Sequence, residues 1–533
     1  MKRLTLLIFV LFFASCAKIG MPTGGVIDTI APKAAKATPN DNSTNFNTNT
    51  FSVEFDEFIE LDNVSQKLLI SPPLNSRPEV GSTLNKLTVR WSDTLQSNTT
   101  YIFDFADAIK DFTEGNKIGN FSYSLSTGDF IDSLSYIGKV VDAYTLKPIN
   151  DKFAMLYDAK KGKDIIRTEK PSYITRLDTF GVFRFRNLAA GEYNLIVLDD
   201  KNQNLIYDLP TEAIAFSSKP VEPFILKDSV IKTDSLPTFF FFEPKDTTIS
   251  IENKTLLSDR KLRLIFSNPV SDSFHITLSN GDTNILNVFS AKRDTLTCYA
   301  VGEKTFDTLK AEVSDGGFEE KIELYYLSKR KSSPAQTFAI PPPNRDLNYF
   351  DKLRLDLPFP CEKDIKVKAS IICDSVTDTI LLTSKEMFLE SEDLFQAGKA
   401  YKLFIDSSTF ANVIGQTNDS LSCIFSVTKP EDYGKISITI AASGKLIVIL
   451  ETLQGKELAT KQAEGNTKVV FDNVKEDKYR IKVIIDSNAN DKWDIGDFDI
   501  DCQPEIVKYF DKTINVRKNW EIEESWTIED AIP

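Results

Sequence analysis

Histidine is almost absent from this sequence of 533 residues, which contains a single one, His275. A zinc site built from several histidines is therefore excluded, and at most one imidazole could serve a serine or cysteine nucleophile as its base. No C-x-x-C spacing, glycine-rich phosphate loop, nucleophile elbow or metalloprotease helix motif occurs either. These absences argue against an enzyme. His275 itself stands in a strand-like alternation, DSFHITL, and we expect an ordinary strand or edge residue there.

Positive charge is also in deficit, with 63 Lys and Arg against 77 Asp and Glu and a formal net charge of −14. A protein that binds nucleic acid presents a basic face, so we expect no nucleic-acid partner. The chain is too long for one hydrophobic core, and its 26% of charged residues is typical of folded proteins, so we expect several soluble domains.

A continuous apolar run occurs at the N-terminus, where the basic MKR precedes LTLLIFVLFF and then Ala14, Ser15 and Cys16. Such a run is too short to span a bilayer. Small residues before a cysteine make it resemble a bacterial lipoprotein signal, although Phe13 stands where that signal usually has leucine. The resemblance implies that residues 1–15 are removed and that Cys16 carries a lipid. The lipid would anchor the mature chain to the membrane, and no part of the chain would span it. A plain secretory signal followed by a fortuitous cysteine is the alternative.

Cysteine usage leaves the redox state open. The five cysteines beyond Cys16 are Cys298, Cys361, Cys373, Cys423 and Cys502. Because five is odd, at least one stays unpaired. One bridge within 361–423 is compatible with an oxidising periplasm, and buried free thiols are the alternative.

Short alternating segments such as KLTVRW and KLRLIF, separated by turn clusters such as PNDNST, predict an all-β chain. Two internal repeats organise it. Phe185–Asp208 matches Phe471–Asp494 without gaps at an offset of 286, and a second, shorter repeat aligns Tyr101 with Tyr401 at an offset of 300. The first match shares these pairs: Phe185/Phe471, Asn187/Asn473, Tyr193/Tyr479, Val197/Val483, Asp200/Asp486, Asn202/Asn488, Asn204/Asn490 and Asp208/Asp494.

Two stretches resemble known domain families. TPNDNSTNFNTNTFSVEFDEF, followed by LQSNTTYIFDF, resembles a bacterial Ig-like domain of the S-layer type. The part from Tyr136 resembles a carboxypeptidase-regulatory or transthyretin-like sandwich, whose ending appears as Gly181, Phe183, Phe185, Asn187, Leu188, Gly191 and Tyr193. The order of these segments along the chain resembles that of the multidomain Ig-like lipoproteins common in Bacteroidota.

The resemblance implies an elongated rod of tandem Ig-like and transthyretin-like β-sandwiches. The expected parts are a signal peptide (1–15), a tether (16–28), an Ig-like domain (29–128), a regulatory-like sandwich (134–243), two Ig-like domains (248–333, which fits loosely, and 334–428), a second regulatory-like sandwich (429–500) and a tail (501–533). NWEIEESW in the tail predicts a terminal strand with Trp520 and Trp526 packing inward.

The two copies of the first repeat end in loops rich in side-chain oxygens, and these are the candidate metal ligands. In the second loop the ligands would be Asp486, Asn488, Asn490, Asp494 and Asp497, at positions 1, 3, 5, 9 and 12 of a calcium loop. The first loop keeps Asp200, Asn202, Asn204 and Asp208, with Thr211 at position 12. Both loops depart from an EF-hand at position 6, where Asp491 and Leu205 replace glycine. A network of Asx turns without metal is the alternative.

These patterns predict a non-catalytic, lipid-anchored scaffold that binds envelope proteins, as an accessory part of an outer-membrane assembly, transport or secretion machine. The tether lacks an early acidic run, which favours the periplasmic face of the outer membrane. The alternative is a carbohydrate-binding surface lipoprotein that uses Tyr207 and Trp493; exposed rings would favour it, and buried rings would not.

Overall fold

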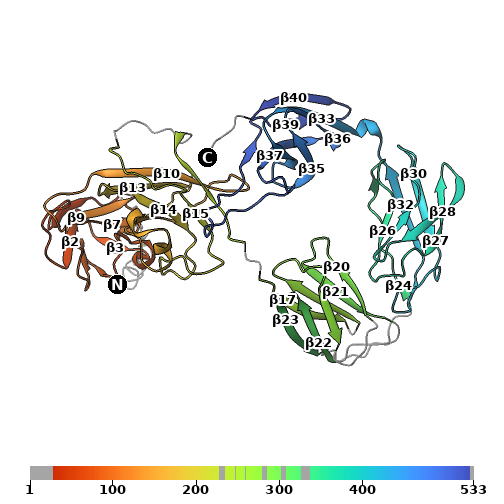
Figure 1. Cartoon of the computed structure of the whole chain (residues 1–533), viewed down its shortest axis with the longest axis horizontal. Coiled ribbons are helices and arrows are strands. Elements are labelled where there is room, and N and C mark those ends of the chain that lie inside the picture. The colour runs from red at the N-terminus through yellow and green to blue at the C-terminus, as the bar shows by residue number, and fades with distance from the viewer. Residues whose placement is uncertain are drawn as a thin grey trace, which may run out of the picture. The chain divides into compact units, whose positions relative to one another are not determined.

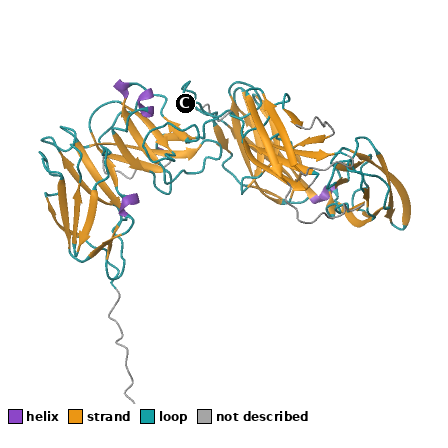
Figure 2. Ribbon diagram, turned by 90° about the horizontal axis from the view of Figure 1, so that it is seen from below, coloured by secondary structure: helices purple, strands orange, loops and turns teal. Residues whose placement is uncertain are grey.

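The computed structural model describes residues 28–226, 235–245, 248–258, 260–278, 285–301, 308–325 and 337–528. The expected signal peptide, Cys16 and nearly all of the tether lie outside these residues. The described chain is nearly all β, as Figures 1 and 2 show, which confirms the predicted fold class. No helix in the described ranges is long and apolar enough to cross a membrane. The chain divides into two compact units, residues 1–142 with 146–243 and residues 143–145 with 244–533.

The first module of the first unit is a sandwich of two sheets, with strand orders β1-β2-β6-β5 and β4-β7-β9, beside the pair β3-β8. Alternation builds its core: in TFSVEF of β2, Phe51, Val53 and Phe55 point inward, and Phe51 stacks on Tyr123 with centroids 3.9 Å apart. Its elements are β1 (Ala34–Thr38), β2 (Thr50–Phe55), β3 (Ile59–Leu61), α2 (Val64–Lys67), β4 (Leu69–Ser71), β5 (Glu79–Thr83), β6 (Lys86–Arg90), β7 (Thr100–Ala106), β8 (Ile109–Asp111) and β9 (Phe121–Ser126).

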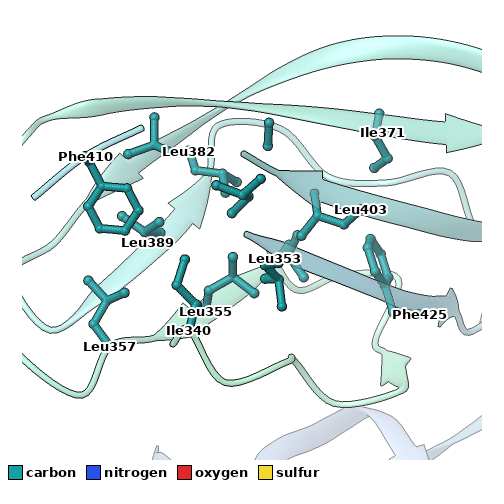
Figure 3. Close-up of a cluster of buried hydrophobic side chains, with 14 of the residues drawn as sticks. Ile340, Leu353, Leu355, Leu357, Ile371, Leu382, Leu389, Leu403, Phe410 and Phe425 are labelled. Carbon is teal, nitrogen blue, oxygen red and sulfur yellow. The ribbon is translucent and has the colours of Figure 1, made fainter. Parts of the chain in front are cut away.

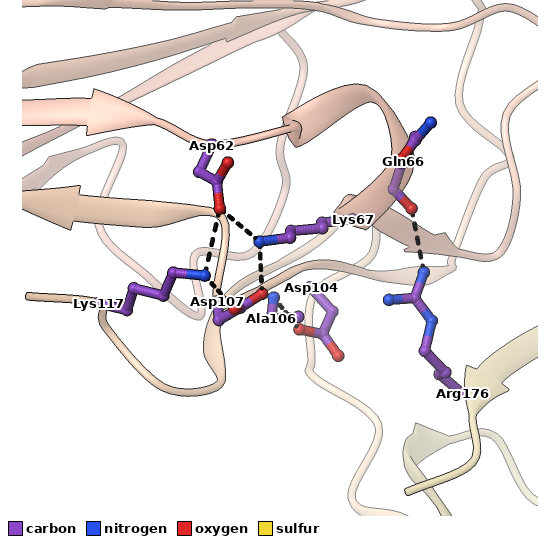
Figure 4. A network of polar contacts seen from close by, with 8 residues as sticks. All are labelled: Asp62, Gln66, Lys67, Asp104, Ala106, Asp107, Lys117 and Arg176. Carbon is purple, nitrogen blue, oxygen red and sulfur yellow. Dashed lines mark hydrogen bonds and ion pairs between the residues drawn. The ribbon is translucent and has the colours of Figure 1, made fainter. Parts of the chain in front are cut away.

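An ion-pair network lies at one end of this module, where two lysines alternate with two aspartates (Figure 4). Lys67 lies 2.8 Å from Asp62 and 2.9 Å from Asp107, and Lys117 lies 2.9 Å from Asp107 and 3.2 Å from Asp62. Hydrogen bonds from Lys117 and Lys67 lower the pKa of Asp107 to about 2.

The second module of this unit has one sheet in the order β13-β10-β16 and another in the order β12-β11-β14-β15. The strand β16 runs parallel to β10, and the others pair antiparallel. Its elements are β10 (Leu134–Asp142), β11 (Phe153–Asp158), the 3-10 turns η1 (Ala159–Lys161) and η2 (Asp164–Arg167), β12 (Tyr173–Arg176), β13 (Val182–Leu188), β14 (Tyr193–Leu198), β15 (Ile214–Phe216) and β16 (Thr238–Phe241).

The second unit begins with the segment that fitted the Ig-like pattern only loosely, and two sheets form there, β17-β18-β21-β20 and β19-β22-β23. His275 is an exposed residue of the edge strand β19, as expected. The strands are β17 (Ile251–Ser258), β18 (Lys261–Phe266), β19 (His275–Leu278), β20 (Ile285–Phe289), β21 (Thr295–Ala300), β22 (Thr308–Asp315) and β23 (Phe318–Tyr325).

The next module has a seven-stranded sheet, β25-β32-β30-β27-β28-β29-β26, and the pair β24-β31. Figure 3 shows the leucine-rich core between these strands, in which Leu355, Leu382, Leu389 and Leu403 are fully buried. The strands are β24 (Thr337–Phe338), β25 (Asp346–Leu347), β26 (Arg354–Asp356), β27 (Lys366–Cys373), β28 (Val376–Ser384), β29 (Phe388–Ser391), β30 (Ala400–Ile405), β31 (Thr417–Asn418) and β32 (Leu421–Val427).

The last module consists of one sheet in the order β36-β33-β40 and a second that contains β35-β34-β37-β38, with β39 also paired to β37. Residues 501–533, expected as a tail, supply three of these strands, so the sandwich continues beyond residue 500. Its elements are η4 (Pro430–Asp432), β33 (Tyr433–Ala441), β34 (Lys445–Thr452), β35 (Glu457–Glu464), β36 (Thr467–Lys475), β37 (Asp477–Asp486), β38 (Val507–Tyr509), β39 (Ile514–Val516) and β40 (Glu521–Thr527).

A buried ion-pair cluster lies on the second sheet of this module. Lys482 is 2% exposed, and its amine lies 3.4 Å from Glu451, which is 1% exposed, and 2.9 Å from Glu457. Arg480 reaches the other oxygen of Glu451 at 2.6 Å. Each buried charge therefore has a partner of opposite sign, which offsets the cost of removing it from water.

The gapless repeat corresponds to one sheet plan used twice. In the second and last modules, a central strand pairs antiparallel with the strand before the repeated tyrosine and parallel with a late strand. Asn187 and Asn473 both have left-handed backbones, with φ of 53° and 58°, where the sheet register shifts. Asparagine tolerates this conformation better than most residues, which explains its presence in both copies.

Candidate functional site

The two oxygen-rich loops lie at the C-terminal ends of β14 and β37, the strands that contain the repeated tyrosines Tyr193 and Tyr479. We call them the Asp/Asn loops, the first comprising residues 200–211 and the second residues 486–497. Their backbones match: Gln203 and Leu205 have φ of 59° and 62°, and Ala489 and Asp491 have φ of 61° and 64°. Position 6, where an EF-hand has glycine, is thus left-handed in both loops despite its side chain.

In the second loop, one carboxylate fixes the backbone and another gathers the amides. Asp486 is 4% exposed and accepts the N–H groups of Asn490 at 3.1 Å and Asp491 at 2.9 Å. Asp494 accepts the side-chain amides of Asn488 at 2.5 Å and Asn490 at 2.6 Å. The oxygens of the same two amides, in Asn488 and Asn490, accept the N–H groups two residues further on, those of Asn490 at 3.1 Å and Lys492 at 2.9 Å, and these are the bonds of Asx turns.

The first loop repeats the arrangement. Asp200 accepts the N–H groups of Asn204 at 3.1 Å and Leu205 at 2.8 Å, while Asp208 accepts the side-chain amides of Asn202 at 3.0 Å and Asn204 at 2.8 Å. Burial raises the pKa of Asp200, the backbone N–H groups oppose that rise, and the charge of Asp208 adds to it.

Asp497, the expected twelfth position, does not join the second loop's network. Its carboxylate accepts the N–H of Asp499, and its backbone pairs with Cys502. Glu505 instead closes the loop, because it accepts the N–H groups of Ser487 at 2.7 Å and Asp494 at 3.1 Å.

Glu212 has the equivalent role in the first loop. It is fully buried and accepts the N–H groups of Lys201 and Asp208, each at 3.2 Å. The gapless alignment of the two copies does not pair these glutamates, because the second copy has seven more residues between its loop and its glutamate. The signal that could have revealed them is a glutamate two residues before the next strand in each copy, ahead of Ile214 and Val507.

The chemistry of the loops is compatible with two arrangements. In the hydrogen-bonded one, nitrogens of Asn488 and Asn490 face Asp494, and within the described ranges no three acidic, thiol or imidazole side chains converge into a metal-binding group. In the metal-bound one, both carboxamides would be rotated by half a turn to direct their oxygens at a cation beside Asp494, and the bonds that these oxygens accept from the N–H groups of Asn490 and Lys492 would be lost. Calcium binding therefore stays a prediction.

The two aromatic residues beside the loops do not form an exposed platform. Tyr207 is 6% exposed, and the guanidinium of Arg167 lies 4.7 Å from its ring centre. Trp493 is half-buried and donates its indole N–H to the carbonyl of Glu505 at 3.1 Å. Its ring also lies beside that of Tyr144, with ring centroids 4.8 Å apart. The exposed rings that would favour sugar stacking are therefore not found at these two positions.

The cysteines and the two C-terminal tryptophans are the remaining residues that the sequence pointed to. All five cysteines that the structure describes are free, and burial raises the pKa of both Cys298 and Cys361 to about 12. Such thiols are poor nucleophiles. Trp526 packs on Phe510 as expected. The expectation for Trp520 was wrong, because it precedes β40 and is 54% exposed.

Comparison with known proteins identifies one module. Residues 28–127 match the family model of the bacterial Ig-like domain. No curated protein sequence matches the chain. Among solved structures, the S-layer protein SbsC is 11% identical over 91% of this chain and 67% of its own, with a TM-score of 0.15. The Bacillus anthracis TIE protein is 10% identical over 99% of this chain and 79% of its own, with a TM-score of 0.14. Residues 28–127 therefore form a bacterial Ig-like domain, the first in a series of β-sandwiches.

Proposed function

We propose that the protein is a non-catalytic scaffold of the bacterial cell envelope that binds other proteins. The observation that carries this proposal is how the candidate polar residues are used. Asp486, Asp494 and Glu505 accept hydrogen bonds from the backbone N–H groups and side-chain amides of their own loop, and the equivalent carboxylates of the second module do the same. Residues that act on a substrate would be directed at a cleft instead.

We further propose that Cys16 is lipidated and holds the chain at the periplasmic face of the outer membrane. The support is the N-terminal sequence, in which a short apolar run leads to small residues and a cysteine. The second and last modules would be regulatory-like sandwiches, a proposal that rests on their shared sheet plan and on the quoted sequence pattern.

Edge strands offer the partner its binding surface. An edge strand has unpaired backbone groups that can accept a strand from another protein. In the module of residues 251–325, β20 is an edge strand whose residues are all exposed or half-buried. Its sequence, ILNVF, has no charged residue to oppose pairing with a partner.

Crosslinking and co-purification of the full chain from native membranes test this function. We expect defined envelope proteins in the crosslinked complexes, and recovery of monomer alone would count against a scaffold. Cys16→Ser is the control for the anchor: it should abolish labelling by a radioactive fatty acid and release the chain from the membrane fraction. Unchanged labelling in that variant would contradict lipidation at Cys16.

A further inference from the structure

A polar cleft lies inside the first unit, between the Ig-like domain and the module that follows it. Its volume is about 380 Å³, near the lower end of the range of small-ligand sites. Strands β4, β7 and β9 line one wall, and β12 and β13 with their connecting turn line the other. The proposed scaffold function does not use it.

Hydrogen bonds between the two modules hold the walls in place. The N–H of Ile174 donates to the buried hydroxyl of Ser71 at 3.0 Å, and the amine of Lys170 donates to the carbonyl of Leu74 at 3.0 Å. A third bond joins Arg176 to the carbonyl of Gln66 at 3.1 Å and is drawn in Figure 4. A cleft with fixed walls does not have to be ordered when a ligand binds, which favours affinity.

Three guanidinium groups lie along one wall. Arg176 is on β12, and Arg184 and Arg186 are alternate residues of β13, so their side chains leave the same face about 7 Å apart. Across the described ranges, neither Arg184 nor Arg186 has a side-chain hydrogen bond or ion pair. Arg176 uses one nitrogen for Gln66 and retains other donors. Two exposed, unpaired arginines side by side are unexpected in a chain of net charge −14.

The two carboxylates in the cleft bind backbone amides instead of these arginines. Asp178 accepts the N–H groups of Phe180 at 2.9 Å and Val182 at 2.8 Å, and Asp104 accepts the N–H of Ala106 at 2.8 Å. The wall formed by β9 contributes the hydroxyls of Ser122 and Ser124. The cleft thus combines surplus positive charge with neutral hydrogen-bond donors.

We propose that this cleft binds a phosphate group, either on a soluble molecule or on a lipid head group. Arginine pairs with phosphate through parallel N–H···O bonds, and a phosphate carries more charge and more acceptor oxygens than a carboxylate. Three guanidiniums with adjacent serine hydroxyls therefore suit a doubly charged phosphate better than a singly charged acid. The arginines supply the affinity, and the serine wall of the Ig-like domain orients the group.

Calorimetric titration of the chain beginning at Ala17, which retains every described residue, tests the proposal. The probes are inorganic pyrophosphate, phosphatidylcholine vesicles with and without phosphatidic acid, and citrate as a carboxylate of similar charge. Arg184→Gln with Arg186→Gln removes two positive charges without removing a described hydrogen bond. The matched control is Arg77→Gln with Arg90→Gln, which removes two exposed arginines of the same unit outside the cleft.

We expect pyrophosphate or the anionic vesicles to bind, with affinity falling as salt rises, and the cleft variant to bind at least tenfold more weakly than the control variant. Binding to pyrophosphate identifies a soluble phosphate as the source, and binding to vesicles alone identifies a lipid head group. Equal binding by the two variants, tighter binding of citrate, or binding of neither phosphate probe would overturn the proposal. None of these outcomes bears on the scaffold function, which the membrane crosslinking decides separately.

Discussion

Glu505→Ala removes the carboxylate that three donors of the second Asp/Asn loop share. They are the N–H of Ser487 at 2.7 Å, its hydroxyl at 2.9 Å and the N–H of Asp494 at 3.1 Å. Glu505 is only 8% exposed, so water replaces it poorly. Leaving a buried donor without its acceptor costs about 1–3 kcal/mol, and two backbone donors therefore put the loss at about 3 kcal/mol.

Native-state hydrogen exchange in the full chain measures this loss, because it reports the last module separately from the others. We expect the amides at the end of β37 and at Ser487 to exchange about 100-fold faster in the variant, which corresponds to about 3 kcal/mol. Glu505→Gln keeps one acceptor oxygen and should lose less. Glu523→Ala, at an exposed position of the same module, should leave the exchange unchanged.

Two results would refute the reasoning. A change in exchange below about fivefold would mean that the loop does not depend on Glu505 for its N–H groups. Equal losses in Glu505→Ala and Glu523→Ala would mean that any acidic residue of the module has the same effect. Glu212→Ala repeats the test in the first copy, where the glutamate is fully buried.

Three further predictions concern metal, buried charge and pH. If calcium occupies the second loop, a chelator lowers the melting temperature of the full chain, and Asp486→Ala removes the difference; an equal melt with calcium and chelator would leave only the turn network. Lys482→Met leaves Glu451 buried with Arg480 as its remaining partner, so about 1–3 kcal/mol of stability should be lost in denaturant titrations; Lys468→Met, at an exposed ion pair, should change little. Because the pKa of Asp107 is lowered, its contribution is complete above the unfolded value near 3.9 and is lost as the pH falls towards 2. Acid titrations of wild type and Asp107→Asn should therefore differ at pH 5 and converge near pH 2, and a constant difference would contradict the ion-pair network.

The sequence was sufficient for features that depend on local pattern. Alternation in stretches such as TFSVEF predicted the strands, because every second residue of a half-buried strand faces the core. The gapless repeat predicted two modules with the same arrangement of strands. Asn187 and Asn473 occur in both copies because each stands where the backbone is left-handed, a conformation that asparagine tolerates. Features that depend on distant pairing were not predicted. β40 joins its sheet by parallel pairing with β33, about eighty residues earlier in the chain, and no local pattern indicates such a partner.

In the candidate site, too, the sequence predicted what depends on local pattern and not what depends on distant residues. The loop residues themselves, Asp486 to Asp494, were found because the repeat aligns them without gaps. Glu505 was missed because the extra residues of the second copy break the alignment just before it. Exposure of Trp520 also depends on where the chain enters β40, and spacing alone does not determine that point.

The difference in length between the two copies also marks a place where the fold accommodates additional chain. Between Asp494 and Glu505 the second copy makes an excursion that the first lacks, and Ile500 at its tip is 73% exposed. Glu212 and Glu505 nevertheless accept the N–H groups at equivalent positions of their two loops. A peptide tag or a small reporter domain inserted beside Ile500 would thus lengthen an existing detour, which gives a position for labelling the protein in living cells with both chain termini left unmodified.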